Sequence, residues 1–167
     1  MIQRQGRFFS ITTQHTTYCF YVTEQGFLQH LYYGQKIDTS SGWQALVPQV
    51  RHFPGNAAVL DGTCLEDTAL EVSFPGLGDL REPFAMVETV DGSPADLRFV
   101  QAAILPEKPA LEGLPSSTEG GQTLEITLSL IHISPSRAQS YMYRAITSLT
   151  CCGCITPTWL WTSLPSL

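Results

Sequence analysis

Acidic residues and lysine are missing from the last forty residues of the chain. Residues 128–167 carry only two charged side chains, those of Arg137 and Arg144. All fifteen acids and seven of the nine Lys and Arg residues lie in residues 1–127 instead. Composition does not normally change so sharply within one domain. We therefore expect one domain over residues 1–127 and a low-charge tail over 128–167 that is not a domain.

Long apolar runs, a basic surface and a paired set of cysteines are also lacking. No run approaches the roughly 20 apolar residues of a membrane-spanning helix, and no apolar segment follows the basic N-terminus as in a secretory signal. The net charge of −6 argues against nucleic acid, whose phosphates require a basic surface. Five cysteines are an odd number and poor evidence for a disulfide framework. We expect a cytoplasmic protein without a membrane or nucleic-acid partner.

Motifs for catalysis and cofactor binding are absent as well. The chain has no glycine-rich phosphate loop, no G-x-S-x-G turn and no histidine pair with zinc spacing. The cluster of Cys151, Cys152 and Cys154 lacks the second half that a zinc site needs. We expect neither a cofactor nor a metal. The sequence alone cannot select a catalytic pair from fifteen acids.

Two-residue alternation is the dominant pattern that is present, while helical periodicity is weak. Tyr18, Phe20 and Val22 share one face of an extended segment, as the strand period requires. Connections of three or four residues join three such segments, which predicts an antiparallel meander because parallel strands need longer crossovers. These segments are 7–13, 18–23 and 27–33. Within the third, His30 is interpreted as a face residue with a hydrogen-bond partner.

Four more strands complete the predicted fold. Asp91-Gly92 is a hairpin signal between two of them, and clean alternation marks the last. The four strands are 68–74, 84–90, 97–105 and 123–128. We therefore predict an all-β fold, an antiparallel β-sandwich, with a disordered or non-native C-terminal tail.

Residues 35–67 are expected to be irregular, and such a long loop in a compact domain is usually functional or mobile. Pro48 limits Trp43–Phe53 to an edge strand or a short helical turn. Arg51 and His52 are the residues of the loop that most suggest a function. They are either a solvated pair or a ligand contact offered outward, and we keep them as candidate substrate-binding residues.

A turn motif lies at Ser73–Pro83, which reads S-F-P-G-L-G-D-L-R-E-P. Its proline and glycine residues, Gly78 and Pro83 among them, stop both helices and central strands. Asp79 and Arg81 are two residues apart, so on extended backbone both side chains point the same way. They can then fix the turn by charge-assisted hydrogen bonds. The alternative is that one of them contacts a sugar or a neighbouring domain.

The order of the motifs resembles the N-terminal domain of bacterial α-galactosidases of glycoside hydrolase family 36. The resemblance covers about residues 1–128, with Phe74 where the family motif has a tyrosine and a shorter spacing before Asp79. It is carried by five blocks in order: F-L-Q-H-L-Y-Y-G, S-F-P-G-L-G-D-L-R-E-P-F, D-G-S-P-A-D-L-R-F, K-P-A-L-E-G-L-P and Q-T-L-E-I-T-L.

The resemblance implies part of a β-supersandwich that precedes a (β/α)8 barrel of roughly 250 residues. In the family the barrel holds both catalytic aspartates and hydrolyses α-galactosides such as melibiose and raffinose with retention. No catalytic residue can be assigned to this chain, which we expect to be inactive without the barrel. The resemblance also implies a homotetramer, in which a loop corresponding to Arg51 and His52 reaches a neighbour's sugar pocket through an acid that is missing here.

Three further expectations follow from this reading. Residues from about 128 onward are hypothesised to be read-through of unrelated DNA, the alternative being a genuine divergent tail. The apolar face of Leu124, Ile126 and Leu128 is expected to lose part of its cover, so that the isolated chain self-associates. The alternative function is a stand-alone carbohydrate-binding or interaction module, with sugars stacked on exposed aromatics at Trp43 or at Tyr32–Tyr33.

Overall fold

The structure is a computed structural model of the 167-residue chain. It describes ten stretches of backbone, and every structural statement below concerns these residues. They are 1–48, 59–60, 63–65, 67–74, 79, 81–84, 95–107, 121–132, 140–149 and 155–159.

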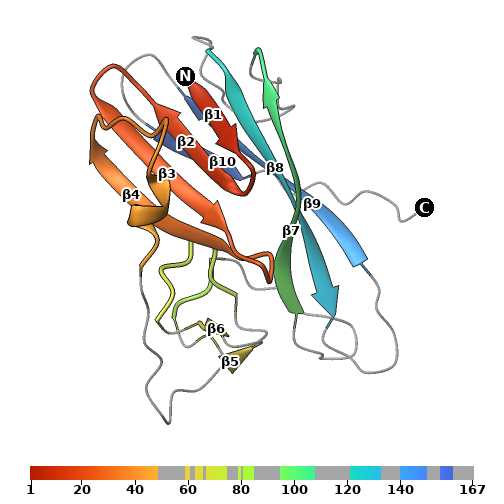
Figure 1. The fold of residues 1–167 in the computed structure, drawn as a ribbon. Helices are drawn as coiled ribbons and strands as arrows, with labels where there is room; N and C mark the ends of the chain where they lie inside the picture. The colour runs from red at the N-terminus through yellow and green to blue at the C-terminus, as the bar shows by residue number, and fades with distance from the viewer. Residues whose placement is uncertain are drawn as a thin grey trace.

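The first sheet is an antiparallel meander of four strands in the order β1-β2-β3-β4 (Figure 1). Gly6 at φ 62° lies in the two-residue turn between the first two strands, and Gly26 at φ 87° in the turn between the last two. Both turns need the left-handed region that glycine enters freely. The predicted meander is confirmed, and one strand precedes it. The four strands are β1 (Ile2–Gln5), β2 (Phe8–Thr12), β3 (Thr16–Val22) and β4 (Leu28–Gln35).

The second sheet is also antiparallel and has the order β10-β9-β8-β7. A short hairpin, β5 (Val59–Leu60) with β6 (Thr63–Cys64), stands apart from both four-stranded sheets. Of the two alternatives for the segment around Pro48, an edge strand or a short helical turn, the structure forms the second as the 3-10 helix η1 (Trp43–Leu46). The strands of the second sheet are β7 (Ala95–Leu105), β8 (Thr123–His132), β9 (Ser140–Leu149) and β10 (Ile155–Trp159).

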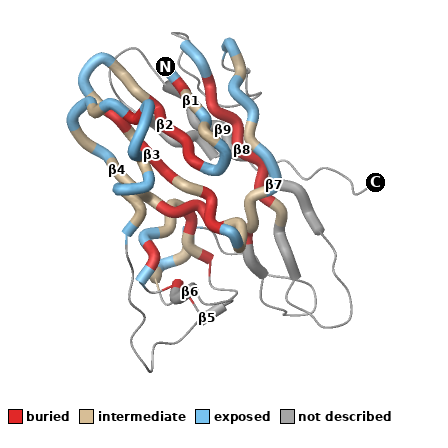
Figure 2. Tube along the Cα trace, viewed as in Figure 1, coloured by how far each residue is buried: buried red, intermediate tan, exposed pale blue. Residues whose placement is uncertain are grey.

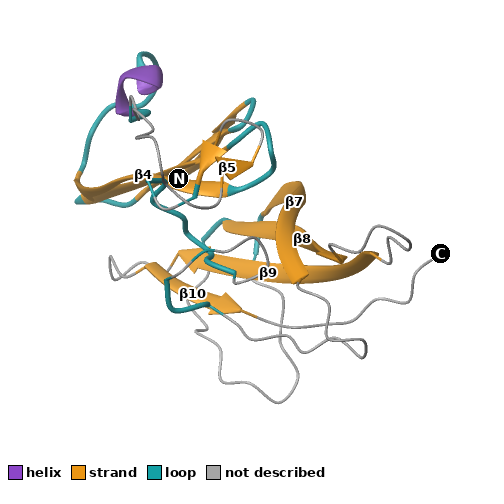
Figure 3. Cartoon of the chain, turned by 90° about the horizontal axis from the view of Figure 1, so that it is seen from below, coloured by secondary structure: helices purple, strands orange, loops and turns teal. Residues whose placement is uncertain are grey.

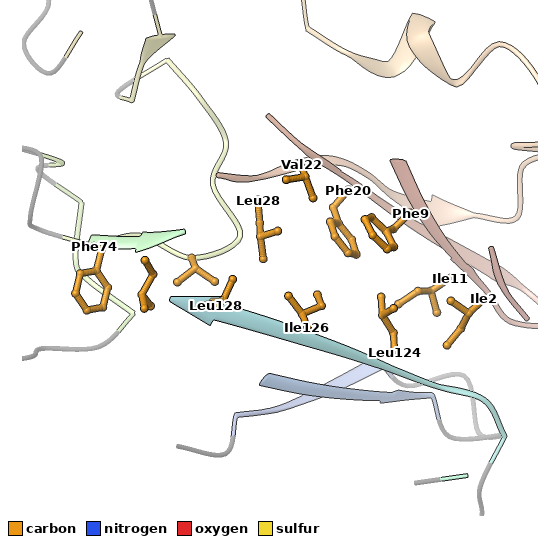
Figure 4. Close-up of a cluster of buried hydrophobic side chains, with 12 residues drawn as sticks. Ile2, Phe9, Ile11, Phe20, Val22, Leu28, Phe74, Leu124, Ile126 and Leu128 are labelled. Atoms are coloured by element: carbon orange, nitrogen blue, oxygen red, sulfur yellow. The ribbon is translucent and has the colours of Figure 1, made fainter. Parts of the chain in front are cut away.

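The two four-stranded sheets lie face to face as separate layers (Figure 3). Apolar side chains from both sheets meet between them, and Phe9 stacks on Phe20 at 4.8 Å (Figure 4). Burying each such side chain contributes about 1.5–3 kcal/mol, so this shared core holds the layers together. The predicted antiparallel β-sandwich is confirmed. The core consists of Ile2, Phe9, Ile11, Phe20, Val22, Leu28, Val72, Phe74, Leu97, Leu124, Ile126 and Leu128.

The alternating face of β8 is fully covered, which corrects one expectation. Leu124, Ile126 and Leu128 share a face as predicted, but each is at most 4% exposed. They do not lack cover, because the first sheet packs directly against them (Figure 4). Among the side chains that the structure describes in this sheet, the large apolar ones that are exposed are Val100 and Ile104 on β7.

The outer face of the first sheet is buried too, since the segment after β4 folds back over it. The Trp43 ring stacks on Phe8 at 4.7 Å and contacts Tyr21. The Thr39 hydroxyl donates to Ser10 Oγ at 3.0 Å, which pairs two buried hydroxyl groups. The two middle strands of this sheet, β2 and β3, are accordingly mostly buried (Figure 2).

Several predicted elements differ from the described structure. Segment 68–74 forms a single bridge, Gln29↔Leu70, rather than a strand. Strand β7 pairs with β8, while its predicted partner, 84–90, lies outside the described residues except for Phe84. No helix in the described part of the chain is both long and apolar enough to cross a bilayer.

Strand β8 runs through the predicted domain boundary at residue 127, and it continues to His132. Strand β9 pairs with β8, and β10 pairs with β9, so the sheet extends into the low-charge segment 128–167. The assignment of that segment to a foreign tail stays a prediction.

Candidate functional site

The first candidate site is the Asp79–Arg81 pair, which the sequence singled out. Arg81 donates from Nε to Asp79 Oδ1 and from Nη2 to Asp79 Oδ2, each at 2.9 Å. The Arg81 backbone N–H adds a third bond to Oδ1 at 3.2 Å. The Asp79 side chain is 1% exposed, and that of Arg81 is 36% exposed. A two-pronged pair of this kind fixes the geometry of both groups more strongly than a single contact.

Arg81 also reaches a segment far back along the chain. Its Nη1 donates to the Thr68 carbonyl at 2.5 Å, and its Nη2 to the Leu65 carbonyl at 2.8 Å. One guanidinium thus joins the carboxylate of Asp79 to two backbone carbonyls, and that of Leu65 also accepts from the Thr68 N–H at 3.2 Å. The arrangement acts as a clamp between residues 65–68 and 79–81, and the name Arg81 clamp is used for it below.

Ser73 ties the other end of the same motif. The Ser73 hydroxyl donates to the Glu82 carbonyl at 2.7 Å, and the Phe84 N–H donates to the Ser73 carbonyl at 3.0 Å. Pro83 lies between these two bonds and is half-buried. Since proline has no N–H to donate, its place between two bonded neighbours leaves no donor unmet. Gly78, Arg51 and His52 lie outside the described residues, so their predicted roles stay predictions.

The second candidate site joins three elements on one face of the first sheet. His30 Nδ1 lies 2.6 Å from Glu71 Oε1. The Tyr18 hydroxyl also bonds to Glu71. The Tyr18 ring contacts that of His30 at 5.7 Å. These three residues, Tyr18, His30 and Glu71, form a cluster that links β3, β4 and the segment after Leu65. The prediction that His30 has a hydrogen-bond partner is thereby confirmed.

Backbone pairing puts Glu71 beside β4. The His30 N–H donates to the Ala69 carbonyl at 2.7 Å, and the Glu71 N–H donates to the Leu28 carbonyl at 2.9 Å. Burial, followed by the charge of Glu71 and the hydrogen bond to it, raises the pKa of Tyr18 well above its usual range. Tyr18 therefore stays a neutral donor toward the carboxylate at every ordinary pH.

Sequence reasoning missed Glu71 and Tyr18 as members of this cluster. Tyr18 was predicted to share a strand face with Phe20 and Val22, and the register of the meander sets it opposite Tyr33. Glu71 gave no local signal, because it comes from 41 residues beyond His30. Among the described residues, no three His, Cys, Asp or Glu side chains gather as metal ligands.

The sequence model of the glycosyl hydrolase family 36 N-terminal domain matches residues 26–132. The chain belongs to this family. The GH36 N-terminal domain match starts at the turn before β4 and ends at the last residue of β8. It contains both the Arg81 clamp and the His30–Glu71 contact.

Curated and solved relatives agree with this assignment. The bifunctional α-galactosidase/sucrose kinase AgaSK of Mediterraneibacter gnavus is 38% identical over 131 residues, which cover 74% of this chain and 14% of AgaSK. The solved galactosidase domain of AgaSK superposes with a TM-score of 0.66 at 29% identity, covering 89% of this chain and 22% of that one. A variant of AgaA from Geobacillus stearothermophilus, solved in complex with raffinose, gives a TM-score of 0.61 at 25% identity, covering 84% and 21%. The chain thus spans less than a quarter of each relative.

Proposed function

We propose that this GH36 N-terminal domain is a non-catalytic part of an α-galactosidase. The observation that carries the proposal is the family match over residues 26–132 together with relatives that are α-galactosidases. The Arg81 clamp supports it, since four of its donor contacts are spent on the domain's own backbone and carboxylate. The guanidinium therefore holds the domain together and takes no part in catalysis.

The hydrolysis of α-galactosides such as melibiose and raffinose is then the task of a barrel elsewhere in the full enzyme. Raffinose is the ligand in the solved AgaA complex, which supports this choice of substrate class. We further propose that the barrel is the partner of this sandwich, that the full enzyme assembles as a homotetramer, and that it works in the cytoplasm without a cofactor.

The first test is direct assay of the 167-residue chain with p-nitrophenyl α-galactoside. We expect no turnover, with a complete α-galactosidase of the family as the positive control. Turnover with retention of configuration would show that the chain carries a catalytic site of its own.

A second test asks for a positive result. In a chimera, residues 1–132 replace the matching segment of the AgaSK galactosidase domain. We expect the chimera to hydrolyse the chromogenic substrate, while the same enzyme with this segment deleted does not. A chimera that folds and still lacks activity would count against the proposal.

One observation favours a second candidate function, that of a carbohydrate-binding module. The Tyr33 side chain is 57% exposed, whereas Trp43 is occupied by stacking on Phe8 and Tyr21. Tyr32 is also occupied, since its hydroxyl donates to the Gln35 carbonyl at 2.8 Å and its ring covers Gly34. Of the three aromatics named for sugar stacking, Tyr33 is therefore the one whose ring stands open.

A further inference from the structure

Glu71 orients the imidazole of His30. A carboxylate only accepts hydrogen bonds, so His30 Nδ1 must carry the proton that bridges the 2.6 Å distance to Glu71 Oε1. In the neutral ring Nε2 is then the acceptor. The Tyr18 hydroxyl donates to the same carboxylate and helps to hold it in place. With 37% of the His30 side chain exposed, the structure presents a fixed acceptor at the surface.

An open aromatic ring lies on the same face. Tyr33 is directly opposite Tyr18 in the β3–β4 register, and the two rings meet edge to face at 6.3 Å. The Tyr18 ring therefore contacts both the Tyr33 ring and the His30 ring. The half-exposed and exposed stretch of β4 that carries them follows its buried beginning (Figure 2).

These groups have the two features that a neutral sugar requires. An aromatic ring offers a flat apolar surface to the C–H face of a pyranose, and a fixed acceptor takes a proton from one of its hydroxyl groups. A few polar groups that converge beside an apolar surface are the usual composition of a small-molecule site. Phe9 and Phe20, by contrast, stack on each other within the core and are not exposed.

We propose that Tyr33 and His30, with Glu71 behind the imidazole, form a saccharide-binding site on β4. A sugar ring stacks on Tyr33, and one hydroxyl donates to His30 Nε2. No bond is made or broken there. The choice of a galactoside as ligand rests on the proposed function, while the site itself rests on the geometry of β3, β4 and Glu71. A single open ring and one acceptor correspond to weak affinity, on the order of millimolar.

The test is saturation-transfer NMR of the 167-residue chain with melibiose and raffinose, together with a titration followed on the histidine and tyrosine ring protons. We expect transfer to the sugar and saturable shifts of the His30 and Tyr33 signals. Tyr33→Ala should weaken binding about tenfold, and Tyr33→Phe should retain it, since the ring alone makes the contact. His30→Phe should weaken binding several-fold by removing the acceptor.

The matched control is Phe84→Ala, which removes another partly exposed aromatic ring, 36% exposed, outside the proposed site. It should leave the titration unchanged. Circular dichroism of each variant shows whether it folds, and His30→Phe keeps the test decisive if Tyr33→Ala does not fold. Two results would overturn the site. One is the absence of saturation transfer at a sugar concentration about 20-fold above the expected dissociation constant of about 1 mM. The other is a titration that neither Tyr33→Ala nor His30→Phe changes. If the AgaSK chimera is active but the titration shows no sugar binding, this site is refuted and the proposed function still holds.

Discussion

Arg81 holds both oxygens of the Asp79 carboxylate and, with the same guanidinium, the carbonyls of Leu65 and Thr68. A residue two positions away and a segment thirteen to sixteen residues away are thereby joined at one point. The Asp79 side chain is 1% exposed, so Arg81 supplies hydrogen bonds that water has little access to provide. The Arg81 clamp lies within residues 26–132, the part of the chain that matches the family.

Breaking the clamp should destabilise the domain. In Asp79→Asn one acceptor oxygen becomes an NH2 group, which only donates, so Arg81 loses the Nη2 contact to Oδ2 and the charge assistance of the contacts to Oδ1. We expect the free energy of unfolding to fall by about 1–3 kcal/mol, less than for a fully buried pair because Arg81 is partly solvated. Urea unfolding followed by fluorescence measures this. Glu24→Gln, at an exposed turn, is the control and should leave the midpoint unchanged. Equal stability of Asp79→Asn and wild type would mean that the clamp contributes nothing.

The inter-sheet core makes a larger contribution. Phe20 is 2% exposed and stacks on Phe9, so Phe20→Ala removes a ring from the contact between the layers. We expect a loss of about 3–5 kcal/mol in the free energy of unfolding. The exposed Val100→Ala is the matched truncation and should change stability by less than about 0.5 kcal/mol. Similar effects from both changes in a thermal melt would argue against the packing of the two sheets.

Cys19 should make the fold sensitive to alkali. Burial raises the pKa of its thiol from 9.0 to about 11. The unfolded thiol loses its proton near pH 9, whereas the folded one keeps it, so this contribution is complete below pH 9 and is lost as the pH rises toward 11. We expect stability to fall over that interval and to fall less steeply in Cys19→Ala. Urea unfolding at pH 8, 9, 10 and 11 gives the slopes, and parallel slopes for the two proteins would contradict the assignment.

Strand β7 should promote self-association of the isolated chain. It stands last in the described sheet order and carries exposed Val100 and Ile104. Open strand edges with apolar side chains pair with other chains unless charges prevent it. We expect species larger than a monomer in size-exclusion chromatography with light scattering, and a larger monomer fraction in the double variant Val100→Lys with Ile104→Lys. A sharp wild-type monomer with a cooperative melt would be the opposite result.

Local patterns in the sequence were enough to predict the meander and the Asp79–Arg81 pair of the Ser73–Pro83 motif. The alternation of Tyr18, Phe20 and Val22 predicted a strand with a buried face, and short polar connections predicted antiparallel neighbours. The two-residue spacing of Asp79 and Arg81 predicted side chains on one side of an extended segment. Each of these inferences concerns residues within a few positions of one another, where backbone geometry leaves few choices.

Strand β1 was missed because its alternation carries only one apolar side chain on the inner face. Ile2 enters the core, while Arg4 on the same face covers the Phe9 ring at 5.2 Å. A long charged side chain that packs along an aromatic ring looks polar in the sequence and behaves as cover in the fold.

The amino-acid order by itself determined an all-β chain with a turn pinned between an acid and a guanidinium, because strand period and turn chemistry act over a few bonds. Only the tertiary structure decided that Glu71 meets His30, that Arg81 reaches Leu65 and Thr68, and that β7 pairs with β8. These contacts close loops of 13 to 41 residues. Which distant partners meet depends on the packing of the whole sandwich and leaves no local pattern to read.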